Sequence, residues 1–296
     1  MANIKKYWCV IIIAVLVFTA YSFCLSAPYK TLDDEASIVK NEDIKSFSNL
    51  GRIFTASFFG GDAYYRPLVS LSFMVEYHFF GLDPFYYYLT NILLHILSAV
   101  LVFLLMEFWL GDTAAAFAVG LLFGIHPVHA EAVTNVPGRA ILLCGFFYLA
   151  SLYSFLLAEK KGKVFTGLSL AAFALSLLSK ESAGVLPLLL IAYLWFFKKD
   201  AKTSRLKLFL PLFPFLVIQA AYIILRQALG ITQLFHWRNA GEALLGFVSF
   251  LRTVITDVRL MILPVDLHFD RMQKVFTNPL EPEVLAKGHL FNCYCG

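Results

Sequence analysis

Three adjacent carboxylates, Asp33-Asp34-Glu35, follow the first apolar run of the chain and are its clearest candidates for proton-transfer chemistry. Adjacent like charges repel one another, and a carboxylate that is partly desolvated at a membrane surface can act as a general base. An acidic loop that only marks one face of a membrane is the alternative interpretation of the same residues. Both interpretations fit the motif taken alone.

Three cations, Arg66, Arg139 and Lys180, lie between or at the ends of later apolar runs. A guanidinium can contact phosphate oxygens bidentately, and a lysine near a membrane can neutralise a lipid phosphate. Snorkelling from the end of a span is an alternative for the lysine. Ion pairs within the chain are the other alternative, with Asp62 or Glu76 for Arg66 and Glu181 for Lys180.

A histidine-rich motif, His126-Pro127-Val128-His129-Ala130-Glu131, follows a short apolar run. Ionisable groups at membrane depth are costly and indicate a water-filled cavity or a partner. His126 and His129 are spaced to share one side of a helical turn and could hold a metal with Glu131, but Pro127 disturbs that turn. We therefore rank hydrogen bonding to a sugar, or a structural network, above a metal site, and expect no metal or other cofactor.

The composition indicates that these groups are carried by a membrane protein. Of 296 residues, 59% are hydrophobic and only 15% are charged, and aromatic residues make up 16%. A soluble domain is about half apolar and about a quarter charged, so this chain has too little polar surface to be one. The net charge of +4 gives no basis for nucleic-acid binding. The five Cys do not form the spacing pattern of a disulfide framework.

Eight apolar runs predict membrane helices and an all-α polytopic membrane protein. We interpret the first run as an uncleaved anchor, because it is longer than the apolar core of a signal peptide, which is the alternative. The predicted organisation is an anchor at 1–27, a first outer loop at 28–85 with the acidic motif and interfacial helices, a helix bundle at 86–270 and a tail at 271–296. The runs are Trp8–Leu25, Tyr86–Leu110, Thr113–Ile125, Ala140–Ala158, Val164–Leu178, Ala183–Phe197, Leu208–Leu229 and Ala243–Leu263.

The loops between these runs separate by charge. If Lys5 and Lys6 are cytoplasmic and the runs alternate in direction, the lysine-rich segments 159–163 and 198–207 are cytoplasmic too. That distribution follows the positive-inside rule. The acidic motif, Arg66, the histidine-rich motif, Arg139 and Lys180 then all fall on the opposite side. The separation predicts a chemical site on the non-cytoplasmic face of a multi-pass protein, for which a bacterial inner membrane is our first expectation and the endoplasmic reticulum the alternative.

In the first outer loop, Phe47, Leu50, Phe54 and Phe58 recur at steps of three and four residues. This spacing predicts one apolar helix face, either lying in the membrane interface or packed against other loops.

The order of the motifs resembles a known family, the transmembrane and tetratricopeptide-repeat O-mannosyltransferases and their bacterial relatives. These are polytopic glycosyltransferases of the GT-C fold. The resemblance runs from about Asp33 to Asp270. The matching elements are Asp33-Asp34, Tyr65-Arg66-Pro67-Leu68, Gly81-Leu82-Asp83-Pro84, Asn91 to His95, Phe123 to Val133, Gly138-Arg139-Ala140, Leu178-Ser179-Lys180-Glu181 and Leu263 to Leu267.

This resemblance implies a polyprenyl- or dolichyl-phosphate sugar as donor and an acceptor hydroxyl, usually of Ser or Thr, in a protein or glycan. It implies an acidic residue at the reaction centre in the first outer loop, which falls on Asp33 or Asp34. Direct displacement of the phosphate predicts inversion at the anomeric carbon. We expect Arg66, Arg139 and Lys180 to bind the donor phosphate, and the sugar or acceptor to contact His126, His129, Glu131 and Glu181.

Two other classes of function fit parts of the sequence. A transporter or flippase of a lipid-linked or anionic solute would use the same charged groups, although such proteins often contain internal repeats, which we do not find here. A non-catalytic, C-terminally truncated remnant is the second alternative, because relatives continue into further spans and repeats while this sequence stops at Gly296.

Overall fold

The computed structural model describes residues 2–29, 32–58, 64–197, 209–231 and 240–265. Their regular structure is helical throughout, which confirms the predicted all-α polytopic membrane protein. Contacts divide the chain into two units, 1–233 and 234–296. The predicted tail at 271–296 lies outside the described residues.

The helices of the first unit lie over the predicted apolar runs, and glycines with positive φ follow α5 and α8. Gly111 adopts a left-handed conformation (φ 66°) after α5, and Asp112 caps the next helix by accepting hydrogen bonds from two backbone amides. The long helices are α1 (Ala2–Tyr21), α4 (Pro67–Phe80), α5 (Pro84–Leu110), α6 (Thr113–Ile125), α8 (Arg139–Lys161), α9 (Lys163–Ser179), α10 (Leu186–Phe197) and α12 (Phe213–Ala228).

Among the described residues, four helical segments are long and apolar enough to cross a membrane. A fifth crossing is formed if Thr113–Ile125 and Pro127–Thr134, which meet at 42°, are taken as one broken span. The 17 residues of α9 reach only about 25 Å, less than the ~30 Å hydrocarbon core. The four segments are Ile4–Ser26, Pro84–Leu110, Val136–Lys161 and Leu210–Ala228.

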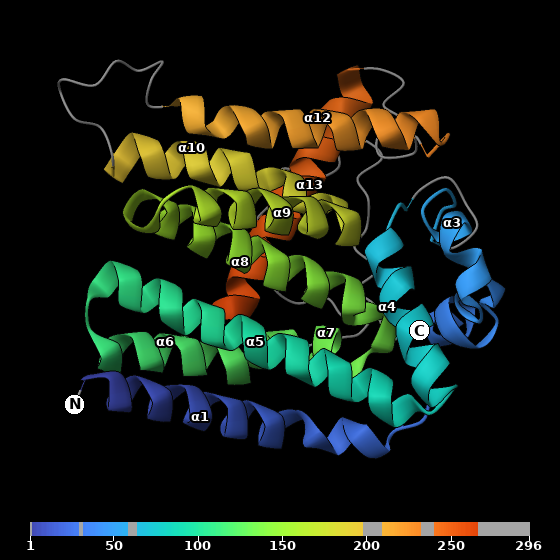
Figure 1. Ribbon diagram of the computed structural model, residues 1–296, viewed down its shortest axis with the longest axis horizontal. Helices are drawn as coiled ribbons and strands as arrows, with labels where there is room; N and C mark the ends of the chain where they lie inside the picture. The colour runs from blue at the N-terminus through green and yellow to red at the C-terminus, as the bar shows by residue number, and fades with distance from the viewer. Residues whose placement is uncertain (1, 30–31, 59–63, 198–208, 232–239, 266–296) are drawn as a thin grey trace. The chain divides into compact units, whose positions relative to one another are not determined.

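The helices of the first unit run side by side, so that its connections gather at two ends (Figure 1). The α5–α6 and α8–α9 connections lie at the end where α1 begins. At that end Lys6 forms a 2.8 Å ion pair with Glu107, and Lys160 lies 4.6 Å from the Phe108 ring centre. The acidic motif and the α6–α8 and α9–α10 connections lie at the other end, as the loop charges predict.

Small residues let the helices pack closely, as is common in membrane bundles. Ser151 in α8 and Ser169 in α9 each donate a 2.7 Å hydrogen bond to the other's backbone carbonyl. Between α5 and α6, a Cβ atom added at Gly120 would lie 2.8 Å from Cβ of Phe103. Tight helix contacts of this kind hold the loop ends, and hence the charged side chains on them, in fixed relative positions.

The described part of the first outer loop before α4 is made of short helical pieces rather than the single helix that the spacing of Phe47 to Phe58 predicts. The acidic motif begins α2 (Leu32–Asp34) and continues as a wider turn, Glu35–Val39, and α3 covers only Leu50–Ile53. Phe47, Leu50 and Phe54 are exposed. Phe58 is buried, and this corrects the expectation that all four residues form one face. The helix α3 ends at Ile53, and beyond it the Phe58 amide donates a hydrogen bond to the Tyr64 carbonyl.

Replacing Gly138 by alanine is expected to destabilise the connection between α7 (Ala130–Thr134) and α8. An added Cβ atom would overlap the carbonyl oxygen of Ala132, so the backbone would have to move. Overpacking of this kind costs about 1–3 kcal/mol, measurable as a lower thermal unfolding midpoint in detergent. Gly145 in α8 is the matched control, because nothing lies within 4 Å of its added Cβ atom. An equal loss for Gly145→Ala would contradict this explanation.

The second unit contributes α13 (Ala240–Ile262), which carries Arg252, Asp257 and Arg259 among apolar residues. The predicted run Ala243–Leu263 does form a helix, but it is not among the segments apolar enough to cross a membrane.

Candidate functional site

A cavity of about 150 Å³ lies where four loop regions of the first unit meet. Asp33 comes from α2, Arg66 precedes α4, and Lys180 lies between α9 and α10. The loop between α6 and α8 supplies much of the remaining wall. We call this the charged cavity, lined by Asp33, Phe58, Arg66, Glu131, Ala132, Asn135, Pro137, Gly138, Ala140, Ile141 and Lys180. It brings together two predicted cations and two predicted carboxylates that lie up to 147 residues apart in the sequence, from Asp33 to Lys180.

Arg66 is held between aromatic rings and a carboxylate. Its guanidinium carbon lies 4.4 Å from the Tyr64 ring centre, and Nη2 donates to Glu181 at 3.3 Å. The Arg66 and Glu181 side chains are only 13% and 21% exposed. Within the described residues, Nε of Arg66 and Oε2 of Glu181 are buried without a hydrogen-bond partner. Because one contact leaves both groups partly unsatisfied, the arginine retains capacity for a second anionic ligand.

Lys180 has an extended backbone (φ −160°) and separates α9 from the helical turn Glu181–Val185. Burial, and then repulsion from Arg66, lower the pKa of its ammonium group below the usual value, although Glu181 and Glu131 act in the opposite direction. The surroundings of Lys180 thus disfavour its charged form. An anion placed between Lys180 and Arg66 would remove that repulsion.

This lowered pKa predicts a pH dependence for anion binding in the charged cavity. As pH rises through the lowered pKa, below the ordinary lysine value near 10.4, Lys180 loses its proton and anion affinity should fall. A phosphate diester keeps a constant charge over this range, so the decline would report the protein. Titration calorimetry from pH 7 to 10 would measure it, and Lys180→Met should flatten the profile. An identical decline in the variant would contradict the assignment.

The two neighbouring aspartates point in different directions. Asp33 is exposed and lines the charged cavity, whereas Asp34 is 1% exposed. Burial is the main cause that raises the pKa of the Tyr29 phenol, and the negative charges of Glu76 and then Asp34 raise it further. Asp34 therefore lies close to Tyr29. The geometry therefore separates a cavity-facing carboxylate, which a substrate can reach, from one directed into the protein.

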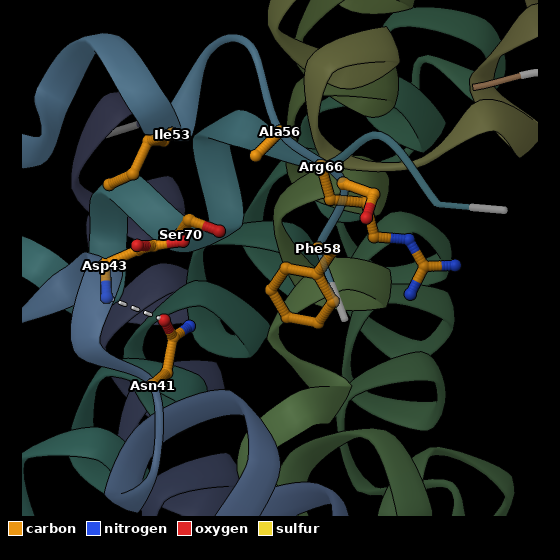
Figure 2. A pocket seen from close by; sticks show the side chains of 8 residues that line it. Asn41, Asp43, Ile53, Ala56, Phe58, Arg66 and Ser70 are labelled. Atoms are coloured by element: carbon orange, nitrogen blue, oxygen red, sulfur yellow. Dashed lines mark hydrogen bonds between the residues drawn. The ribbon is translucent and has the colours of Figure 1, made fainter. Parts of the chain in front are cut away.

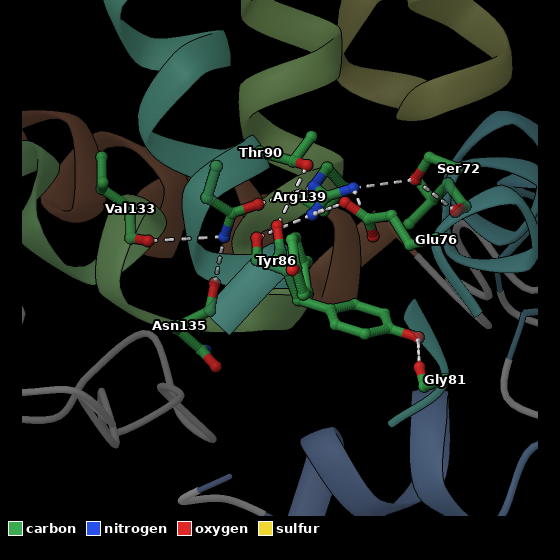
Figure 3. Close-up of polar contacts among 11 residues, drawn as sticks. Ser72, Glu76, Gly81, Tyr86, Thr90, Val133, Asn135 and Arg139 are labelled. Carbon is green, nitrogen blue, oxygen red and sulfur yellow. Dashed lines mark hydrogen bonds and ion pairs between the residues drawn. The ribbon is translucent and has the colours of Figure 1, made fainter. Parts of the chain in front are cut away.

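Arg139 does not line the charged cavity but lies beside it in a buried network (Figure 3). Its guanidinium forms two bonds with Glu76, at 3.0 and 3.1 Å, and Nε donates to Asn91 at 2.6 Å. Ser72 and the Tyr87 carbonyl accept the remaining bonds. We call these residues the Arg139 network. Asn91 in turn donates to the carbonyls of Val133 and Asn135, so the network supports the cavity wall.

The two histidines of the motif make contacts with the turn between α6 and α7 and with neighbouring rings. Nδ1 of His126 accepts a bond from the amide of Val128 and so caps the turn Pro127–His129. The His129 ring packs 4.5 Å from that of Phe123 and 5.2 Å from that of His95. Neither lines the charged cavity, and no cluster of three or more metal-ligating side chains occurs in the part of the chain that the structure describes. Of the histidine-rich motif, Glu131 alone reaches the cavity.

Sequence reasoning missed Phe58 and Asn135 as cavity residues. Phe58 and Arg66 also border a second cavity of about 10 Å³, room for about one water (Figure 2). In that view the Arg66 guanidinium points away from Asn41 and Asp43. Asn135 follows the histidine-rich motif and carries no signal of its own in the sequence.

A buried arginine in α12 was also missed. Arg226 is 2% exposed and lies 5.9 Å from the Tyr222 ring centre. The Tyr222 hydroxyl donates to the Tyr65 carbonyl at 3.4 Å, next to Arg66 in the chain. A charged residue within an apolar run is the sequence signal that would have found it.

Comparison with known proteins gives consistent similarities. Residues 67–225 match the family model described as dolichyl-phosphate-mannose-protein mannosyltransferase. The chain is 37% identical over 131 residues to protein O-mannosyl-transferase tmtc2 of Xenopus laevis, covering 42% of this chain and 16% of that protein. It is 32% identical over 194 residues to protein O-mannosyl-transferase TMTC3 of Homo sapiens, covering 61% of this chain and 21% of that protein. No solved structure matches.

The chain spans about a fifth of the length of the curated relatives it matches. The residues that the family model matches, 67–225, include eight of the eleven residues that line the charged cavity.

Proposed function

Because this chain belongs to the dolichyl-phosphate-mannose-protein mannosyltransferase family, we propose that it transfers a mannosyl residue from a polyprenyl- or dolichyl-phosphate donor to a protein hydroxyl. The acceptor is a Ser or Thr side chain. The charged cavity opens on the non-cytoplasmic side, with the Lys6 and Lys160 end in the cytoplasm, in keeping with the positive-inside rule. A bacterial inner membrane, with the cavity facing the periplasm, is the compartment we propose.

The observation that carries the proposal is the combination of groups around one cavity. A carboxylate, Asp33, and two cations, Arg66 and Lys180, line the same 150 Å³ space at one end of the bundle. Transfer from a phosphate-linked sugar needs a base for the acceptor proton and positive charge for the leaving phosphate.

In the proposed reaction Asp33 accepts the proton of the acceptor hydroxyl as its oxygen attacks the anomeric carbon. The bond from that carbon to the phosphate oxygen breaks, and the lipid phosphate leaves with the bonding electrons. Arg66 and Lys180 stabilise the charge that develops on the phosphate, an effect that is larger in a water-poor cavity. Attack from the face opposite the leaving group inverts the anomeric configuration. None of these steps requires a metal.

Replacing Lys180 by methionine tests the phosphate-binding half of the proposal. A charge-assisted hydrogen bond is worth about 1.5–3 kcal/mol, so Lys180→Met should weaken dolichyl-phosphate binding roughly 10- to 100-fold in titration calorimetry. Lys160→Met is the matched control, because Lys160 lies beside Phe108 at the opposite end of the bundle. Equal weakening by both substitutions would argue for nonspecific attraction to lipid phosphate, and no weakening by either would exclude Lys180.

A further inference from the structure

Asn135 has an unused hydrogen-bonding group in the wall of the charged cavity. Its side-chain oxygen is buried, and no described residue forms a hydrogen bond with it. Buried polar atoms in folded proteins are nearly always paired, so an unpaired one calls for an explanation. A ligand in the cavity that Asn135 lines would supply the missing donor.

Backbone requirements do not explain an asparagine at this position. Asn135 has φ −118° and ψ 126°, an extended conformation open to any residue, and its side chain caps neither adjoining helical turn. Asparagine is common in turns because it tolerates left-handed backbone and bonds to nearby amides. Neither property is in use here, so the side chain is free to serve a ligand.

The position of Asn135 is held firmly through its backbone. Its carbonyl accepts bonds from Nδ2 of Asn91 at 2.9 Å and from the Gly138 amide at 3.0 Å. Asn91 is itself held by Arg139. Figure 3 shows the Asn135 side chain directed away from this network. A ligand-binding group on a rigid support loses little freedom when it binds, which favours specificity.

The charges around Asn135 define the ligand that it would bind. Arg66 and Lys180 attract an anion, while the Asn135 oxygen accepts a hydrogen bond. Phosphate oxygens can accept hydrogen bonds from the two cations, but an ionised phosphate cannot donate one to Asn135. A ligand that carries hydroxyl groups next to a phosphate satisfies both the cations and Asn135, and the 150 Å³ volume accommodates about ten water-sized groups.

We propose that Asn135 is a specificity-determining residue that accepts a hydrogen bond from a ring hydroxyl of the sugar attached to the donor phosphate. This inference rests on the proposed function and assigns the recognition of the sugar, as distinct from the phosphate, to a named side chain. It predicts that Asn135 contributes to binding only when the lipid phosphate carries a sugar.

The experiment compares two lipids, dolichyl phosphate and dolichyl-phosphate mannose, binding to the full chain in nanodiscs. Asn135→Ala should weaken binding of the mannosylated lipid roughly 3- to 10-fold, the effect of one neutral hydrogen bond, and leave dolichyl-phosphate binding unchanged. Asn135→Leu, which fills the space without an acceptor, should show the same selectivity. Ile141→Ala is the matched control, because it also removes wall atoms but no polar group, and should affect both lipids alike.

Two results overturn the inference and are distinguishable from failure of the proposed function. If wild type prefers the mannosylated lipid and Asn135→Ala keeps that preference, Asn135 does not recognise the sugar. If Asn135→Ala weakens both lipids equally, its role is structural. If wild type binds neither lipid, the proposed function itself fails, and the Asn135 inference fails with it.

Discussion

Substituting Asp33 by asparagine is expected to reduce mannosyl transfer by about 10²–10⁴-fold, the usual contribution of a general base. The substitution keeps the size of the side chain but removes its ability to take the acceptor proton. Asp33 is exposed in the charged cavity, so the loss should appear in the transfer rate while donor affinity changes little. Single-turnover transfer from dolichyl-phosphate mannose to a Ser/Thr peptide, with excess full-length protein, measures the chemical step directly.

The neighbouring aspartate is the matched control for this prediction. Asp34→Asn alters an identical side chain at the next position, but Asp34 is buried and does not line the cavity. We expect it to lower the thermal unfolding midpoint more than Asp33→Asn does, and to retain more of the transfer rate. A greater loss of transfer in Asp34→Asn than in Asp33→Asn, at equal folded fraction, would assign the base to Asp34. Unchanged transfer in both variants would remove the proposed base altogether.

Substituting Arg139 by methionine should cost about 3–5 kcal/mol of unfolding free energy, because it leaves a buried carboxylate without its partner. Arg139 is fully buried and the Glu76 side chain is only 8% exposed. The substitution also takes donors from Asn91, Ser72 and the Tyr87 carbonyl. Chemical or thermal unfolding in detergent would measure the loss.

A second substitution separates this structural role from the phosphate-binding role that the sequence predicts for Arg139. Removing both charges in Glu76→Leu with Arg139→Met should recover part of the lost stability, since a buried ion pair replaced by apolar residues is often tolerated. Only part of the lost stability is expected to return, because Asn91 and the Tyr87 carbonyl still lack a hydrogen-bond donor. If Arg139→Met leaves stability unchanged and abolishes binding of dolichyl phosphate, Arg139 is a phosphate ligand and our interpretation of the network is wrong.

Most of the fold could be predicted from the sequence because the signals are local. Apolar runs interrupted by Gly, Pro and charged residues mark helix ends within a few residues, as at Gly111-Asp112 and Lys161-Gly162. The distribution of lysines also predicts which helix ends lie together, and Lys6, Glu107 and Lys160 do meet at one end of the bundle. Family membership, predicted from the order of the motifs, is confirmed by the match over residues 67–225.

The details of the site depend on contacts between residues far apart in the chain, and a single sequence gives no signal for such contacts. Glu76 lies 63 residues before Arg139, and nothing in either motif indicates that they pair. Likewise, adjacent aspartates look alike in the sequence until a helical turn directs one into the cavity and the other inward. The histidines are the most conspicuous motif in the sequence. In the structure, however, His126 caps a turn and the His129 ring packs against the Phe123 ring. The roles predicted for the site residues stay predictions until substrates are tested.

The most direct test of the charged cavity is a cryo-electron microscopy map of the full chain with dolichyl-phosphate mannose bound in a nanodisc. Our account predicts the phosphate within hydrogen-bonding distance, about 3 Å, of Arg66 and Lys180, with the anomeric carbon directed toward Asp33. Density for the phosphate at the opposite end of the bundle, beside Lys6 and Lys160, would contradict it.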